Sequence, residues 1–219
     1  MSPPNRSIPL LTRASLAEKD PSRKLNYALV LGVLGSNAGS ETLLKALGDN
    51  PTWDKGYNMS SKRETANTFS KVDRLVIALG LTRSPKALPA LLDKLKMLKA
   101  DSALSHVKAI CIALRANRGV ALARPLADLL DKPGMSGHSQ AADYHRSSSP
   151  QTKPRTITQR ATTGGLLNAK FRELLIAGLL LDCGDLNGKA RTILEAYKKD
   201  IQGLFASYAR AAMDGELTR

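Results

Sequence analysis

The chain contains one glycine-rich segment with the residue types of a phosphate-binding loop. The segment Gly184–Ala190, GDLNGKA, includes the Gly-Lys pair that reaches nucleotide phosphates in such loops. It has one residue too few between its glycines, and Ala190 stands where a serine or threonine would bind Mg²⁺. We therefore interpret this segment as a turn between two helices.

Two histidines and an aspartate lie close enough in sequence to be considered as metal ligands. They are His138, Asp143 and His145. Their spacing is irregular, and the two cysteines, Cys111 and Cys183, lie elsewhere inside apolar runs. We predict no metal site, and two buried cysteines that do not form a disulfide framework.

No group of residues has the pattern of a catalytic site. Asp49, Asp54 and Glu64 share one polar segment, but polar loops routinely contain such carboxylates. His106 stands at the start of an apolar helix, where we expect a partly exposed structural residue. The nucleophile motif GxSxG and the dinucleotide motif GxGxxG are both missing from the sequence. We therefore predict no catalytic, cofactor-binding or metal-binding residue.

The composition is that of a folded, basic and helical protein. The 219 residues carry a formal net charge of +14, and 42% of them are hydrophobic, which excludes a fully disordered chain. Aromatic residues make up only 4%, fewer than a small all-β domain usually needs. No apolar run is long enough for a signal peptide or a membrane span. We therefore expect a cytoplasmic protein without a membrane partner.

Four segments of the chain share one layout, in which an apolar helix, a short turn and a second apolar helix follow one another. Equivalent leucines near the end of the first helix mark the repeat: Leu34, Leu79, Leu114 and Leu181. Asp20-Pro21, Ser84-Pro85 and the pair Ser70 and Asp73 are start signals of such helices. The repeat predicts an all-α fold, an α-solenoid of about four stacked antiparallel hairpins of the HEAT or armadillo type.

The repeat also divides the chain. We predict a flexible segment 1–19, a repeat domain 20–212 and a tail 213–219, with two long loop insertions at about 48–68 and 132–164. Insertions in solenoids collect on one face and often carry binding. Residues of the two insertions therefore form the candidate interaction surface: Trp53, Tyr57, Lys62, Arg63, His138, Lys153, Arg155 and Arg160.

The basic excess raises nucleic-acid binding as an alternative function. A solenoid of this charge could present a cationic face to DNA or RNA. Aromatic residues for base stacking are scarce and are not interleaved with the basic residues. The candidate contributors are Arg23, Lys24, Lys62, Arg63, Lys94, Lys96, Lys99, Lys153, Arg155 and Arg160. A DNA glycosylase of the HEAT-like type is the enzyme that would fit this size and charge.

Several segments together resemble one known arrangement. They are Trp53–Met59 (WDKGYNM), Leu75–Arg83 leading into Lys86–Leu92, Leu104–His106, and Lys132–His138 (KPGMSGH). In this combination the chain resembles the C-terminal helical-repeat region of bacterial FAD-dependent oxidoreductases. The resemblance extends from about Leu25 to Tyr208.

The resemblance implies an accessory module without flavin chemistry of its own. In that family, a large flavin domain precedes HEAT-like hairpins, and nothing in this chain matches the flavin domain. FAD is therefore expected only in a missing partner domain, and no FAD-binding or catalytic residue is transferred to this chain. The implied function is a non-catalytic interaction module whose partner is a protein or a domain, in first place the flavin domain.

Overall fold

The computed structural model describes residues 4–59, 68–140 and 157–216, and for residues 4–6 and 157–163 it describes the backbone alone. These residues form an all-helical fold without a β-strand, which confirms the all-α part of the predicted fold class. Among the described helices, none combines the length and the hydropathy that a membrane span requires. The α-helices are α1 (Pro4–Ala17), α2 (Pro21–Val33), α3 (Ser40–Gly48), α4 (Lys71–Leu81), α5 (Ala87–Lys96), α6 (Leu104–Arg115), α7 (Ala123–Leu130), α8 (Ile157–Asp182), α9 (Lys189–Lys198) and α10 (Gly203–Met213).

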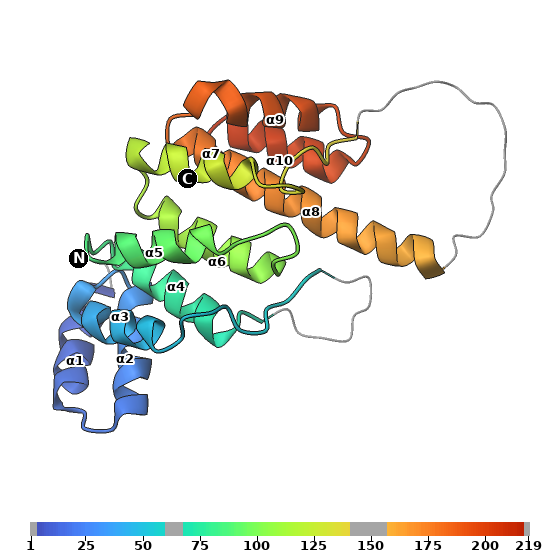
Figure 1. The fold of residues 1–219 in the computed structure, drawn as a ribbon. Coiled ribbons are helices and arrows are strands. Elements are labelled where there is room, and N and C mark those ends of the chain that lie inside the picture. Colours follow the sequence, from blue (N-terminus) through green and yellow to red (C-terminus); the bar gives the residue numbers. More distant parts are fainter. Residues whose placement is uncertain (1–3, 60–67, 141–156, 217–219) are drawn as a thin grey trace, which may run out of the picture.

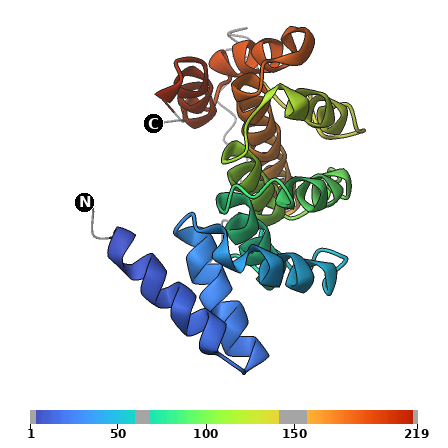
Figure 2. The ribbon, with the colours of Figure 1, turned by 90° about the vertical axis from the view of Figure 1, so that its left-hand side faces the viewer.

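The helices are arranged around a central layer. Helices α2, α4, α6 and α8 form this layer, each packing against the next (Figure 1). Helices α3, α5, α7 and α9 cover one side of it and are called the outer helices here. Helices α1 and α10 stand on the opposite side, at the two ends of the layer, where α1 packs on α2 and α10 packs on α8 and α9 (Figure 2).

Helical periodicity explains the core. The buried leucines Leu75, Leu79, Leu91 and Leu95 recur at the spacing that places them on one side of α4 and of α5. The main cluster runs from α2 to α9, and a second one joins α8, α9 and α10. Both cysteines are buried as predicted, and burial raises the pKa of Cys111 to about 12.

Two of the three predicted helix starts are confirmed. The Asp20 side chain accepts a hydrogen bond from the Arg23 amide at 2.9 Å, and Ser70 and Asp73 form a reciprocal capping box. The third prediction is wrong, because α5 begins at Ala87, whose amide bonds to the carbonyl of Ser84. A turn at residues 85–86 therefore precedes this helix.

Two predicted boundaries also need correction. The segment 1–19, predicted to be flexible, contains α1, because Ile8, Leu11 and Ser15 repeat at helical spacing and lie on its more buried side. The second insertion does not extend to 164, because α8 begins at Ile157. Its residues 141–156, and residues 60–67 of the first insertion, lie outside the described part of the chain.

Small residues set the spacing within the central layer. A Cβ atom added to Gly32 of α2 would lie 2.6 Å from the Ala78 carbonyl oxygen of α4. A Cβ added to Gly80 of α4 would overlap the backbone of Ala113 in α6. These approaches fix both the distance and the register between neighbouring helices.

The substitution Gly80→Ala is expected to lower the free energy of unfolding by about 1–3 kcal/mol, because α4 and α6 must separate to admit the methyl group. The matched control is Gly165→Ala in α8, where the new Cβ meets nothing within 4 Å. There, helix propensity alone predicts a gain of up to about 1 kcal/mol. Urea denaturation of both variants measures the two values, and a gain for Gly80→Ala would contradict the close approach.

Candidate functional site

The structure places the eight predicted surface residues in very different surroundings. Trp53, Tyr57 and His138 are half-buried and described in full. Arg160 lies in the first part of α8, where no side chains are described. The remaining four lie outside the described residues: Lys62, Arg63, Lys153 and Arg155.

The first crossover segment, residues 50–59, runs across the end of the helical stack from α3 to α8. Its backbone exchanges two hydrogen bonds of 3.1 Å with Ser105, between the Tyr57 amide and Ser105 Oγ and between the Ser105 amide and the Tyr57 carbonyl. Further along, Asn168 of α8 bonds both the amide and the carbonyl of Met59. The segment also supplies helix caps, because Asn58 Oδ1 accepts from the Leu104 amide at the start of α6.

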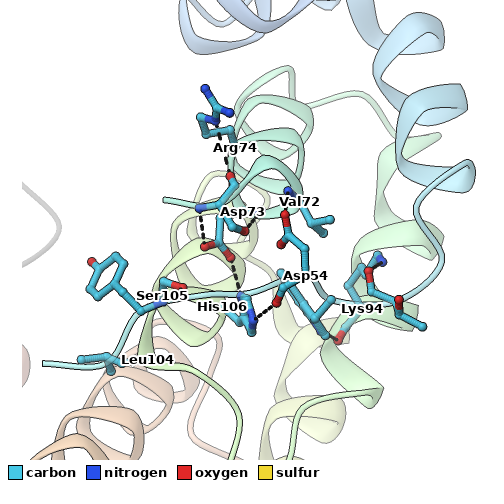
Figure 3. A network of polar contacts seen from close by, with 12 residues as sticks. Asp54, Val72, Asp73, Arg74, Lys94, Leu104, Ser105 and His106 are labelled. Atoms are coloured by element: carbon cyan, nitrogen blue, oxygen red, sulfur yellow. Dashed lines mark hydrogen bonds and ion pairs between the residues drawn. The ribbon is translucent and has the colours of Figure 1, made fainter. Parts of the chain in front are cut away.

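A buried histidine joins this segment to the helices (Figure 3). His106 Nδ1 lies 2.7 Å from Asp73 Oδ1, and its Nε2 lies 3.1 Å from the carbonyl oxygen of Asp54. Trp53 stacks on the imidazole with ring centroids 4.5 Å apart. Both ring nitrogens therefore lie within hydrogen-bond distance of an oxygen atom. His106 is therefore a buried anchor, which corrects the expectation of partial exposure.

The Asp73 carboxylate is held ionised by its neighbours. Burial acts to raise its pKa, but hydrogen bonds from His106, the Ser70 amide and the Ser105 side chain outweigh burial and lower the pKa below 3.8. The same carboxylate closes the capping box at the start of α4. Asp73 therefore couples the start of α4 to α6.

Lys94 of α5 is also turned inward. Its Nζ donates to the carbonyls of Asn50, Pro51 and Thr52 at 2.7, 2.9 and 3.3 Å, and it lies 5.6 Å from the centre of the Trp53 ring. Burial lowers its pKa, against the attraction of Asp54. Lys94 is therefore not an exposed cation of the kind that the sequence predicts, because its ammonium group holds the first crossover segment.

The second crossover segment, residues 132–140, is anchored in the same way by two buried acids. The amides of Gly137 and His138 donate to the Glu173 carboxylate at 2.8 and 2.9 Å, and the Gln140 amide donates to Asp200 at 2.8 Å. His138 Nε2 contacts the Gly134 carbonyl at 3.0 Å. Asp143 and His145, the other residues of the histidine group, lie outside the described residues.

An ion pair without solvent contact lies beneath this segment. Lys170 of α8 donates to Asp200 at 2.8 Å, and both side chains are fully buried. Burial acts to raise the pKa of Asp200, but Lys170 and the amides of Gln140 and Gln202 lower it overall. The neighbouring Tyr197 hydroxyl donates to Glu173 at 2.8 Å, and burial together with this carboxylate raises the pKa of the phenol.

Acidification is expected to destabilise the protein through both carboxylates. Asp73 and Asp200 have folded-state pKa values below the ordinary 3.8, so their stabilising contribution is present above pH 3.8 and is lost as the pH falls through the lowered values. Urea denaturation between pH 6 and pH 2 measures this loss. The double substitution Asp73→Asn/Asp200→Asn should flatten the profile, and an unchanged profile would contradict these assignments.

The loop that resembles a phosphate-binding loop is a turn between α8 and α9, as predicted. Gly184 and Gly188 have φ values of +109° and +69°, which glycine adopts without strain. The amides at the start of α9 are already used, because the Asp185 carboxylate accepts from Ala190 and Arg191 at 2.6 and 3.3 Å. The protein's own carboxylate thus occupies the position where an anion would bind.

A surface that the sequence interpretation did not identify lies on the side of the central layer opposite the outer helices. We call it the inner face. Helices α1, α2, α4 and α6 contain two basic residues each, and their only acidic residue is the buried Asp73. The residues of the inner face are Arg23, Asn26, Tyr27, Val30 and Val33 of α2, Arg74, Ile77 and Leu81 of α4, and Lys108, Ile112 and Arg115 of α6.

The outer helices carry acidic as well as basic side chains. Each of α3, α5, α7 and α9 carries one exposed acid, and each acid forms an ion pair of 2.8–3.4 Å with an exposed base. On the inner face, Arg115 pairs with Asp182 at 3.0 Å. Within the described residues, Arg23, Arg74 and Lys108 form no ion pair. Within the described residues, the inner face therefore carries exposed bases and no exposed acid, whereas the outer helices carry exposed charges of both signs.

The inner face is also apolar. The side chains of Val30, Val33 and Ile112 are 47%, 60% and 38% exposed. Beside them, α1 and α2 border an open, mainly apolar hollow of about 260 Å³. It is lined by Leu11, Arg23, Asn26, Tyr27 and Val30. A signal for this face exists in the sequence, because the absence of acids from α2 and α6 is visible there.

Comparison of the chain with protein families, with curated proteins and with solved structures finds no match in any of the three.

Proposed function

We propose that the chain is a HEAT-like α-solenoid that acts as a non-catalytic interaction module, of the kind that follows the flavin domain in FAD-dependent oxidoreductases. In this proposal the partner is a protein domain, in first place a flavin domain, in the same or another chain. FAD is bound by that partner and not by this module.

The order of packing supports the solenoid. The pairs α2–α3, α4–α5, α6–α7 and α8–α9 follow one another along the chain, and their first helices pack in the same order. A hairpin of this size cannot bury its apolar side alone, whereas neighbours that repeat it form one continuous core. Helices α1 and α10 are additions at the two ends.

The observation that carries the interaction function is the inner face. Corresponding sides of α2, α4 and α6 lie next to one another, and their exposed apolar side chains lie beside Arg23, Arg74 and Lys108, which form no ion pair with a described residue. Extended surfaces of this kind are what solenoids use for binding. An exposed apolar surface with a polar rim is typical of a protein interface.

The experiment is capture of the partner by the tagged chain from extracts of its own cells, followed by measurement of flavin fluorescence in the captured material. A captured flavoprotein supports the proposal, and the Ile112→Glu variant tests whether the inner face is used. Capture of proteins without flavin would overturn the flavoprotein assignment. A purified chain that itself carries flavin would overturn the placement of FAD in the partner.

The unpaired basic residues also favour one second candidate, a HEAT-like nucleic-acid-binding protein. This candidate predicts binding to duplex DNA at low ionic strength, with an affinity that falls steeply as salt is added. A glycosylase would in addition release bases from alkylated DNA. Absence of binding at about 50 mM salt would remove this candidate, because phosphate contacts are strongest there.

A further inference from the structure

We infer that the inner face binds an acidic, amphipathic helix of the partner protein. The inference rests on the proposed interaction function and adds the surface and the chemistry of the ligand. It follows from the position of one apolar row, from the basic residues beside it and from the shape of the surrounding helices.

The apolar row is formed by three aliphatic side chains of three consecutive central helices. The contacts of Gly32 with Ala78 and of Gly80 with Ala113 fix the register between these helices. In this register the positions of Val30, Ile77 and Ile112 along the helix axes differ by no more than about one helical turn. An apolar strip that crosses three helices matches the stripe that an amphipathic helix presents at i, i+3, i+4 and i+7.

The basic residues lie on the same side, toward the first turns of the helices. Arg74 and Lys108 are each about one turn before the apolar residue of their own helix, and Arg23 is about two turns before Val30 on α2. Among the described residues, Arg74 Nε bonds only the Ser70 carbonyl, at 3.4 Å, and Lys108 Nζ lies 5.7 Å from the centre of the Tyr57 ring. No described carboxylate pairs with them, so their charges favour carboxylates on one side of the bound helix.

Helices α1 and α10 border the inner face at its two ends. Helix α1 stands beside α2 and α10 beside α8, on the same side of the central layer as the inner face (Figure 2). The hollow between α1 and α2 accepts one large apolar side chain, with Leu11, Tyr27 and Val30 as its apolar lining. A leucine or an aromatic residue of the ligand would be anchored there, in the way that buried anchors dominate interfaces.

The same surface is less suited to a nucleic acid. Phosphates would have to lie over the apolar row, whereas nucleic-acid interfaces are polar and rich in positive charge. Tyr27 is the single aromatic side chain on the described inner face, so successive bases would find no stacking platform. Nucleic-acid binding is therefore kept as an outcome of the test.

The test uses the full chain and a labelled synthetic peptide, because the natural ligand is unidentified. The probe is an amphipathic helix with leucine at i, i+3, i+4 and i+7 and glutamate on one flank. Two further probes are a scrambled peptide of the same composition, which has no apolar stripe, and duplex DNA. Fluorescence anisotropy at low and physiological salt measures the dissociation constants.

Two variants of the inner face and one control separate the contributions. Ile112→Glu interrupts the apolar row, and Arg74→Glu/Lys108→Glu reverses the charge beside it. Each should weaken binding of the amphipathic probe by at least about tenfold. Lys45→Glu/Arg191→Glu makes the same change of net charge on the outer helices, where both residues are exposed, and should change the affinity by less than about twofold. Circular dichroism and thermal unfolding verify that each variant is folded.

Every outcome decides the inference. Preferential binding of the amphipathic probe, weakened by both inner-face variants and not by the control, supports it. Equal binding of the scrambled peptide, equal weakening by the control, or binding of DNA alone overturns it. If a captured flavoprotein binds Ile112→Glu as tightly as the unchanged chain, the proposed function stands and this inference fails. If the probe binds the inner face and no flavoprotein is captured, the inference stands and the flavoprotein partner fails.

Discussion

Replacing Lys170 with methionine is expected to lower the free energy of unfolding by about 3–5 kcal/mol, because the substitution leaves Asp200 as a buried charge without its cation. Methionine approximates the length of the lysine stem, so the apolar packing around the stem changes little, while the contact of Nζ with the Phe205 ring at 5.2 Å is lost with the ion pair. The cost arises from the carboxylate. The amides of Gln140 and Gln202 still donate to it but carry no full charge.

Urea denaturation measures this loss, and the double variant Lys170→Met/Asp200→Asn isolates its cause. The second change removes the unpaired charge, so the double variant should recover a large part of the lost stability. Hydrogen exchange gives a local readout, because the amides of Gln140 and Gln202 bond to Asp200. If the double variant is less stable than Lys170→Met alone, the loss comes from packing and the ion-pair explanation is wrong.

The helices were predictable because their signals are local. The leucines of α4 and α5 repeat at helical spacing, and the capping box of Ser70 and Asp73 lies within four residues of sequence. Helix α1 was missed for a local reason as well, since prolines at positions 3, 4 and 9 obscure its apolar side. Hydrophobic periodicity identifies a helix where the apolar side is long, but the short apolar side of α1 is a weaker signal than the three prolines, which disfavour a helix.

The two crossover segments were not predictable in the same way. Their polar, turn-rich composition indicates exposed insertions, and the sequence therefore predicts Trp53 and Tyr57 as part of a binding surface. In the structure the first segment is held by Lys94, Ser105 and Asn168, which lie 42 or more residues away from the atoms that they bind. The second is held by Glu173 and Asp200, which lie 35 or more residues away. Such partners become neighbours only when the helices stack, so no local pattern reveals them.

Net charge alone does not locate the charged surfaces either. A value of +14 describes the whole chain and does not separate its surfaces. In the structure, exposed acids such as Glu41 and Asp93 lie on the outer helices beside basic partners. Arg74 and Lys108 lie on the inner face and form no ion pair with a described residue. The functional signal is therefore the distribution of the acids and not the number of the bases.

The second large effect concerns His106, the buried residue that joins the first crossover segment to α4 and α6. His106→Leu is expected to lower the free energy of unfolding by about 3 kcal/mol at neutral pH, because it leaves the buried Asp73 carboxylate without its hydrogen bond to His106. His138→Leu is the matched control. His138 is only half-buried and contacts one carbonyl, so its loss should cost no more than about 1 kcal/mol.

The pH dependence separates electrostatics from packing in this variant. Burial raises the pKa of Asp73 and the hydrogen bond from His106 opposes it most strongly, so removing His106 moves this pKa upward. Acidification then protonates Asp73 more readily in the variant, and the stability difference from the unchanged protein should shrink as the pH falls toward 3. Fluorescence of Trp53, the only tryptophan, reports the same site during unfolding, since its ring stacks on His106. A difference that stays constant with pH would mean that His106 acts only by packing against Trp53.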